Sequence, residues 1–187
     1  MSDSAAVISD CERRMGKTID VLQQDLSGIR TGRASPSLLD KVQVEAWGST
    51  QPVQSVATIS VPEPRLLVIQ PWDRSLIGAI EKAIQKSDLG LNPNNDGSVI
   101  RLALPQLNEQ RRQELAKQVR KRAEESKVAV RNVRRDADSG LKRLEKDGKI
   151  SQDDLRRALD RVQKLTDSSI KQVDEAADRK EKEVKEV

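Results

Sequence analysis

The segment from Asn108 to Lys146 spaces its apolar residues so that a helix places them on one side. These positions form eight steps over 29 residues, or 3.6 residues per step, and only one of them is polar. They are Leu115, Val119, Ala123, Ser126, Val130, Val133, Ala137, Leu141 and Leu144. Because this spacing matches the repeat of a straight α-helix, it indicates packing along a bundle rather than in a strongly wound coiled coil.

Two other segments repeat this amphipathic pattern. Residues 5–30 carry apolar side chains at steps of three and four, and so do residues 155–177, which follow a turn at 146–149 and a capping-box-like start at Ser151. The chain is 35% hydrophobic and 34% charged, so none of these helices is expected to be stable alone. The sequence therefore predicts an elongated three-helix bundle, about 55 to 60 Å long at ~1.5 Å per residue. We expect residues 178–186 to fray.

Residues 31–104 follow a different pattern. Short β-rich runs predict strands near 42–44, 53–61, 66–69 and 100–104, with a helix over 74–87 and a turn over 92–97. Trp47 and Trp72 stand at strand ends, and we expect them to close this small sheet rather than to serve as functional anchors. The predicted fold class is α+β. A discontinuous bundle, residues 1–30 plus 106–187, carries an inserted β/α/β domain, residues 31–105.

An inserted domain requires the chain to leave the bundle and return to it. If the first two long helices pack antiparallel, both crossings lie at the same end of the bundle, at residues 30–36 and 104–106. Thr31-Gly32 breaks the helical pattern and Pro105 ends the strand pattern. We therefore predict a two-stranded hinge made by Arg30, Thr31, Gly32, Arg33 and Pro105.

Positive charge is concentrated on the 108–146 helix. Residues 106–146 hold 13 Lys/Arg against 7 Asp/Glu, net +6, whereas the whole chain is +4 and residues 31–104 balance at seven of each sign. A charge-rich helix face is often only solvated, but this one gathers its cations in one arc. The predicted phosphate-binding residues are Lys117, Arg120, Lys127, Arg131, Arg134 and Arg135, with Lys142 beside them. With no Tyr or Phe and two Trp, base stacking is not expected, so an RNA partner would be read through its backbone and shape.

The sequence offers no constellation for catalysis. It has no histidine, which removes imidazole bases and histidine metal sites, and it has no glycine-rich nucleotide-binding motif. We predict no catalytic residue, no metal and no cofactor, and hence no enzyme. Cys11 is expected to be a buried core residue. No membrane span or signal-peptide pattern is visible, so we expect a cytoplasmic protein without membrane association.

Four segments carry a resemblance to a known family. They are Leu26-Ser-Gly-Ile-Arg-Thr-Gly-Arg-Ala-Ser-Pro36, Ser87-Asp-Leu-Gly-Leu-Asn-Pro93, Val128-Ala-Val-Arg-Asn-Val-Arg-Arg-Asp136 and Gln163-Lys-Leu-Thr-Asp167. In order and spacing, over nearly the full length, the chain resembles the ribosome recycling factors of bacteria and organelles. It departs from that family at Asn108, where Thr or Ser is usual, and in lacking Tyr and Phe in the small domain, which is therefore expected to be less stable.

The resemblance implies an L-shaped molecule similar in outline to a transfer RNA. It implies binding to the ribosome after termination, with the bundle against ribosomal RNA of the large subunit, and splitting into subunits together with elongation factor G and its GTP hydrolysis. On this basis Arg131, Arg134 and Arg135 would be the principal RNA contacts, and Arg30, Gly32 and Arg33 would serve the hinge.

Other function classes make different predictions. A helical adaptor would oligomerise through its apolar faces and would favour a 3.5-residue period. A general RNA-backbone-binding protein would bind duplexes without preferring ribosomes. An enzyme would show turnover by the isolated chain. The 3.6-residue period and the inserted domain argue against the adaptor, and we expect a monomer.

Overall fold

The structure is a computed structural model that describes residues 3–186. The chain divides into two compact units. The bundle unit contains residues 3–30 and Glu109–Glu186, and the inserted unit is Thr31–Asn108. Each unit has its own core and is described by itself.

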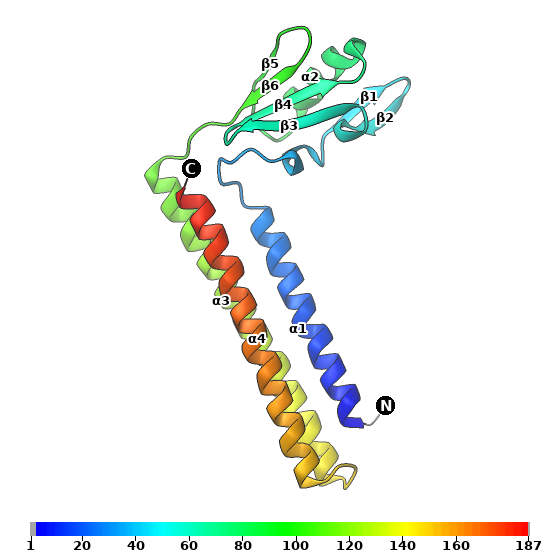
Figure 1. Ribbon diagram of the computed structural model, residues 1–187, viewed down its shortest axis with the longest axis vertical. Coiled ribbons are helices and arrows are strands. Elements are labelled where there is room, and N and C mark those ends of the chain that lie inside the picture. Colours follow the sequence, from blue (N-terminus) through cyan, green and yellow to red (C-terminus); the bar gives the residue numbers. More distant parts are fainter. Residues whose placement is uncertain (1–2, 187) are drawn as a thin grey trace. The chain divides into compact units, whose positions relative to one another are not determined.

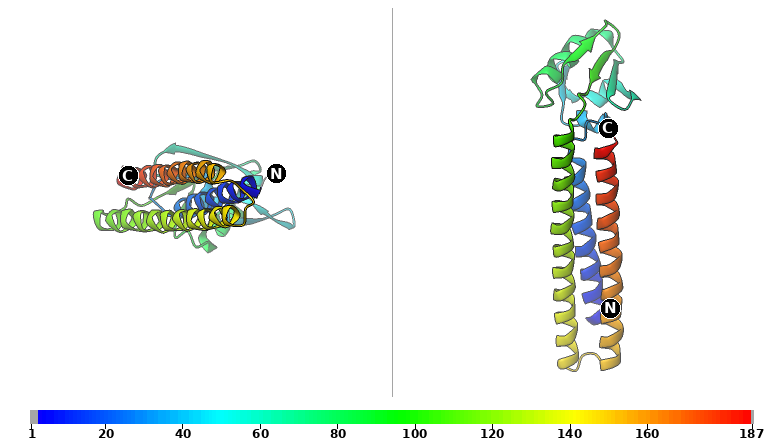
Figure 2. Two further views of the ribbon diagram at one scale, coloured as in Figure 1. Left: turned by 90° about the horizontal axis from the view of Figure 1, so that it is seen from below. Right: turned by 90° about the vertical axis from the view of Figure 1, so that its left-hand side faces the viewer.

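The bundle unit consists of three long helices. They are α1 (Asp3–Ser27), α3 (Glu109–Lys146) and α4 (Gln152–Lys185). Every pair of these helices is in contact, and α1 and α4 run antiparallel to α3 (Figures 1 and 2). The predicted three-helix bundle is therefore confirmed.

The apolar face predicted for α3 forms its part of the core. Seven of its nine positions are buried, while Ser126 and Leu144 are half-buried. Cys11, Met15, Ile19, Leu22 and Leu26 of α1 are buried as well, as expected. Polar groups in this core have partners, because Ser169 Oγ donates to Met15 Sδ at 3.5 Å and Thr166 Oγ1 donates to the Val162 carbonyl at 2.8 Å. Helical periodicity alone thus located the core.

The helix ends agree in part with the sequence patterns. Ser151 and Asp154 form the expected capping box, in which Ser151 Oγ accepts from the Asp154 N–H at 3.0 Å. Helix α1 ends at Ser27, two residues before Ile29, although Ile29 is still buried. The expected fraying of residues 178–186 is wrong, because α4 is helical to Lys185 and Val184 is fully buried.

The inserted unit is built on two antiparallel sheets. A four-stranded sheet has the order β3–β4–β6–β5, and a separate hairpin pairs β1 with β2. The strands are β1 (Gln43–Ala46), β2 (Ser49–Pro52), β3 (Ala57–Glu63), β4 (Leu66–Pro71), β5 (Pro93–Asn95) and β6 (Ile100–Ala103), and the helix is α2 (Ile77–Lys86). The sequence patterns missed β2, and they assigned β5 to a turn although Pro93–Asn95 pairs with Ile100–Leu102. The predicted α+β class is nevertheless confirmed.

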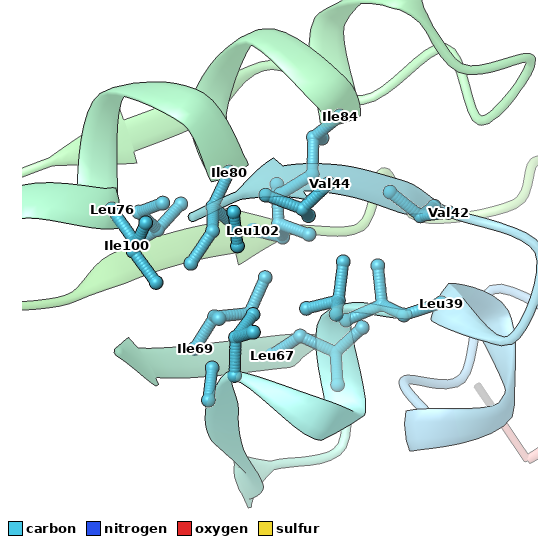
Figure 3. Close-up of a cluster of buried hydrophobic side chains, with 14 of the residues drawn as sticks. Leu39, Val42, Val44, Leu67, Ile69, Leu76, Ile80, Ile84, Ile100 and Leu102 are labelled. Atoms are coloured by element: carbon cyan, nitrogen blue, oxygen red, sulfur yellow. The ribbon is translucent and has the colours of Figure 1, made fainter. Parts of the chain in front are cut away.

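Aliphatic side chains alone fill the core of the inserted unit. Residues from the sheet, the hairpin and α2 converge in it, and all those labelled in Figure 3 are buried: Leu39, Val42, Val44, Leu67, Ile69, Leu76, Ile80, Ile84, Ile100 and Leu102. The two tryptophans do not close this sheet, because Trp47 and Trp72 are each 65% exposed. That expectation is wrong: the aliphatic cluster is complete without an aromatic ring.

Candidate nucleic-acid interface

Two of the six predicted cations on α3 form ion pairs with acidic side chains of α4. Arg120 Nη2 donates to Asp178 Oδ1 at 2.9 Å and also to Glu181. Lys127 Nζ lies 2.5 Å from Asp174 Oδ1 and 3.2 Å from Glu124 Oε1, and its side chain is only 15% exposed. The hydrogen bonds that Arg120 donates to Glu181 and Asp178 raise its pKa, and those that Lys127 donates to Asp174 and Glu124 raise the pKa of Lys127. These two charges are largely compensated within the bundle.

The other four predicted cations form no salt bridge within residues 3–186. They are Lys117, Arg131, Arg134 and Arg135, which we call the uncompensated cations. Lys117 and Arg135 are exposed, and Arg135 Nη1 donates to Asn132 Oδ1 at 3.3 Å. Arg131 and Arg134 are half-buried. Four cations along one helix without an internal counter-charge make a surface that can neutralise phosphates.

The Arg134 side chain is buried as far as its Nε atom. Its Nε is buried and has no hydrogen-bond partner among the described residues. Arg112 Nε is buried without a partner in this part of the chain as well, and neither atom is open to a ligand. Arg134 and its neighbour Arg135 mark residues 131–135 as the densest part of the uncompensated surface.

Sequence reasoning placed all six cations on one side of α3 but could not tell which of them α4 would cover. A usable signal was present: Asp174, Asp178 and Glu181 are spaced four and three residues apart and therefore share one face of α4. An apolar neighbour was also missed, because Val128 is 52% exposed one turn before Arg131. The face thus combines cations with an exposed aliphatic side chain.

A groove between α1 and α3 was not predicted. Its volume is about 750 Å³, and its walls include the cations Arg13, Arg14, Lys17 and Arg122. Three of them are paired: Arg13 with Asp10 at 2.7 Å, Arg14 with Asp136 at 2.8 Å and Arg122 with Glu125 at 3.5 Å. The groove is therefore a weaker anion-binding surface than the uncompensated cations.

Neither a metal site nor a reactive thiol is apparent in the described part of the chain. Residues 3–186 contain no group of three or more His, Cys, Asp or Glu that could hold a metal ion. Cys11 is buried in the bundle and burial raises the pKa of its thiol. The thiol lies 4.0 Å from Met15 Sδ, as a core residue would. Over the same residues, no helix is long and apolar enough to cross a membrane.

The predicted hinge residues lie where the chain passes between the units. The units divide after Arg30 and after Asn108, and Gly32 has φ +77, a conformation that favours glycine. Just inside the inserted unit, the Ala34 N–H donates to the Pro64 carbonyl at 2.7 Å and the Leu104 N–H donates to the Arg65 carbonyl at 2.8 Å. Both crossings are thus tied to the same β3–β4 turn.

The fold and this surface define a class: a helical bundle, interrupted by a small α+β unit, that presents a cationic helix face. The family model for ribosome recycling factor matches residues 22–184. The chain belongs to the ribosome recycling factor family, whose members are translation factors rather than enzymes.

Individual relatives match over nearly the full length. The ribosome-recycling factor of Symbiobacterium thermophilum is 60% identical over 181 residues, covering 97% of this chain and 98% of that protein. The ribosome-recycling factor of Halalkalibacterium halodurans is 56% identical over 184 residues, covering 98% of this chain and all of the relative.

Two solved structures are also similar. A solution structure of the ribosome recycling factor matches with a TM-score of 0.80 at 42% identity, and each chain is covered completely. A model of the T. thermophilus ribosome recycling factor, described together with E. coli elongation factor G bound to the E. coli post-termination complex, matches with a TM-score of 0.66 at 43% identity over 98% of this chain and 99% of that one.

Proposed function

We propose that this protein splits post-termination ribosomes into subunits, in the cytoplasm, together with elongation factor G and GTP. The observation that carries the proposal is the similarity, at 43% identity and over 98% of this chain, to a recycling factor described on a post-termination complex with elongation factor G. Both units of this chain are covered by that similarity. The partners are therefore proposed for the whole molecule rather than for one unit.

The anchor in this proposal is the face of α3 that carries the uncompensated cations. Ribosomal RNA of the large subunit presents a dense array of phosphates, and each cation that neutralises one releases counterions. Arg131, Arg134 and Arg135 supply planar guanidinium groups, which bind phosphate through two donors at once. Arg120 and Lys127 have a secondary part, because their ion pairs with α4 must weaken before they bind RNA.

The moving part in this proposal is the inserted unit. Residues 30–33 and 105–108 connect it to the bundle, and the hydrogen bonds from Ala34 and Leu104 fix both crossings to one turn. Rotation about two neighbouring crossings requires changes in few backbone angles, and Gly32 tolerates such changes best. A push on the inserted unit by elongation factor G would thus move it against the ribosome while the bundle stays anchored.

The experiment is a splitting assay. Post-termination ribosomes are mixed with this protein, elongation factor G and GTP, and subunit separation is followed by light scattering. We expect the scattering to fall only when all three are present. Splitting without this protein, or none with all three although the protein binds ribosomes, would contradict the proposal.

A further inference from the structure

The two tryptophans are the most exposed large apolar side chains of the described chain. Trp47 and Trp72 are each 65% exposed, compared with 38% for Val61 on β3 of the same unit. The chain has no Tyr or Phe, and the core of the inserted unit is entirely aliphatic. The only aromatic rings of the molecule thus lie on the surface, where they contribute little to folding.

The two indoles are held beside one carboxylate. The Trp47 side chain lies close enough to Asp73 to contribute, after the Ser75 hydrogen bonds, to the lowered pKa of its carboxyl, and Trp72 directly precedes Asp73 in the chain. Trp72 Nε1 donates to Thr58 Oγ1 at 2.9 Å, which fixes the second ring at its polar edge. We call Trp47, Trp72 and Asp73 the indole patch. The Trp72 N–H has an intramolecular partner, and both rings remain largely open to solvent.

The backbone conformation of Trp47 indicates that its side chain serves binding rather than folding. Trp47 and Gly48 form the two-residue loop between the paired residues Ala46 and Ser49, with φ +48 and +81. Such a loop favours Asn-Gly, and a bulky residue in the left-handed region is an outlier. Trp47 is the one non-glycine residue with positive φ in the described part of the chain. An unfavourable conformation that displays an exposed indole points to a binding role.

The chemistry of the indole patch favours a cationic protein segment over RNA. Asp73 accepts from the Ser75 N–H at 2.9 Å and the Ser75 hydroxyl at 2.8 Å, and these bonds hold the pKa of its carboxyl below the usual value, so it is charged at neutral pH. That charge repels phosphates. Indole faces attract guanidinium and ammonium groups, and Trp is enriched where protein partners bind tightly. The inserted unit as a whole has no net charge to attract nucleic acid.

We propose that the indole patch is a docking surface for a protein segment that presents an arginine or lysine beside apolar side chains. The inference rests on the proposed function in one respect: the segment is sought on the protein components of the post-termination ribosome and on elongation factor G.

The first test is site-specific photocross-linking. A benzophenone side chain is placed at position 47 or 72, with position 61 as the control, and each protein is irradiated on post-termination ribosomes with elongation factor G. We expect adducts from 47 and 72 that survive ribonuclease, map to a peptide containing Lys or Arg, and exceed those from 61. Adducts that are mainly RNA, or no more abundant than at 61, would overturn the inference.

The second test separates folding from docking. Trp47→Asn suits the loop better, so we expect its melting temperature to be unchanged or higher, while the concentration needed for half-maximal splitting rises about 10-fold. Asp73→Asn retains the acceptor for Ser75 but removes the charge, and we expect about a 5-fold rise. Val61→Asn, the matched control, should change this concentration by less than about 2-fold.

An unchanged splitting concentration for folded Trp47→Asn would overturn the inference. Failure of the proposed function looks different, because the unsubstituted protein would then not split ribosomes at all. The cross-linking readout remains decisive in that case, since it reports protein or RNA at the patch independently of splitting.

Discussion

The bundle unit and the inserted unit differ in how they build a core and in which chemical groups they expose. The bundle unit uses a thin core, mainly of Ala, Val and Leu with Cys11 and Met15 from α1, along three helices and carries its net positive charge on one of them. The inserted unit packs fifteen aliphatic residues into one cluster, balances its charges and exposes both tryptophans. The contrast teaches that surface chemistry is divided between the units: cations suited to phosphates on one, indoles beside a carboxylate on the other.

Core substitutions are expected to have the largest effects on the two units. Leu141→Ala in the bundle unit and Ile80→Ala in the inserted unit each remove a fully buried aliphatic side chain. We expect each to lower the free energy of unfolding of its own unit by about 3 kcal/mol. Hydrogen exchange measured unit by unit should show the loss confined to the substituted unit. Equal loss of protection in both units for either variant would mean that the two cores unfold as one.

Charge reversal on α3 is expected to have the next largest effect. Arg131→Glu with Arg134→Glu should weaken ribosome binding by roughly 30-fold, because two phosphate contacts become repulsive. The matched control is Lys164→Glu with Lys171→Glu, which makes the same change in charge at exposed positions of α4. We expect the control to bind within about 2-fold of the unsubstituted protein. Ribosome pelleting measures both losses. Similar losses of affinity for both pairs would mean that net charge alone, and not the basic face of α3, determines binding.

The crossing between the units is the next place to test. Gly32→Val forces a β-branched residue to φ +77 and should slow splitting about 10-fold while ribosome binding changes less. Gly97→Val is the control, since Gly97 has φ +90 in the turn between β5 and β6, away from the crossing. Both variants should lose similar stability. If Gly97→Val slows splitting as much, the effect is strain in the inserted unit and not loss of a hinge.

The smallest expected effect is on the pH dependence of the stability of the inserted unit. Hydrogen bonds from the Val99 N–H, the Arg101 guanidinium and the Ser98 N–H hold the pKa of Asp96 well below its usual value. A carboxyl whose pKa is lowered by folding stabilises the fold above its unfolded pKa of about 4 and loses that contribution as the pH falls further. The difference in melting temperature between the unsubstituted protein and Asp96→Ala should therefore be constant from pH 5 to 7 and shrink below about pH 4. A constant difference down to pH 2 would contradict this.

Much of the bundle was predictable because its information is local. The 3.6-residue spacing of Leu115, Val119 and their successors identifies a helix face without knowledge of its partners. The inserted unit was harder, because polar Ser49–Pro52 becomes a strand only by pairing with β1, and Pro93–Asn95 only by pairing with β6. Pairing of this kind depends on residues elsewhere in the chain.

The surface was predictable only in outline. Angular position on α3 gathered the six cations, but the ion pairs of Arg120 and Lys127 depend on acidic residues more than 40 positions away on α4. The exposure of Trp47 and Trp72 likewise follows from an aliphatic core that was already full. The RNA-binding and hinge assignments stay predictions, and the experiments above address them residue by residue.

We infer that the uncompensated cations of α3, and not the charge of the whole chain, bind RNA phosphates. The most direct measurement is the salt dependence of ribosome binding for Arg131→Gln with Arg134→Gln and for Lys164→Gln with Lys171→Gln. We expect the slope of log affinity against log salt concentration to become shallower by about 1.5 in the α3 pair and to stay unchanged in the α4 pair. Equal slopes for the two pairs would contradict it.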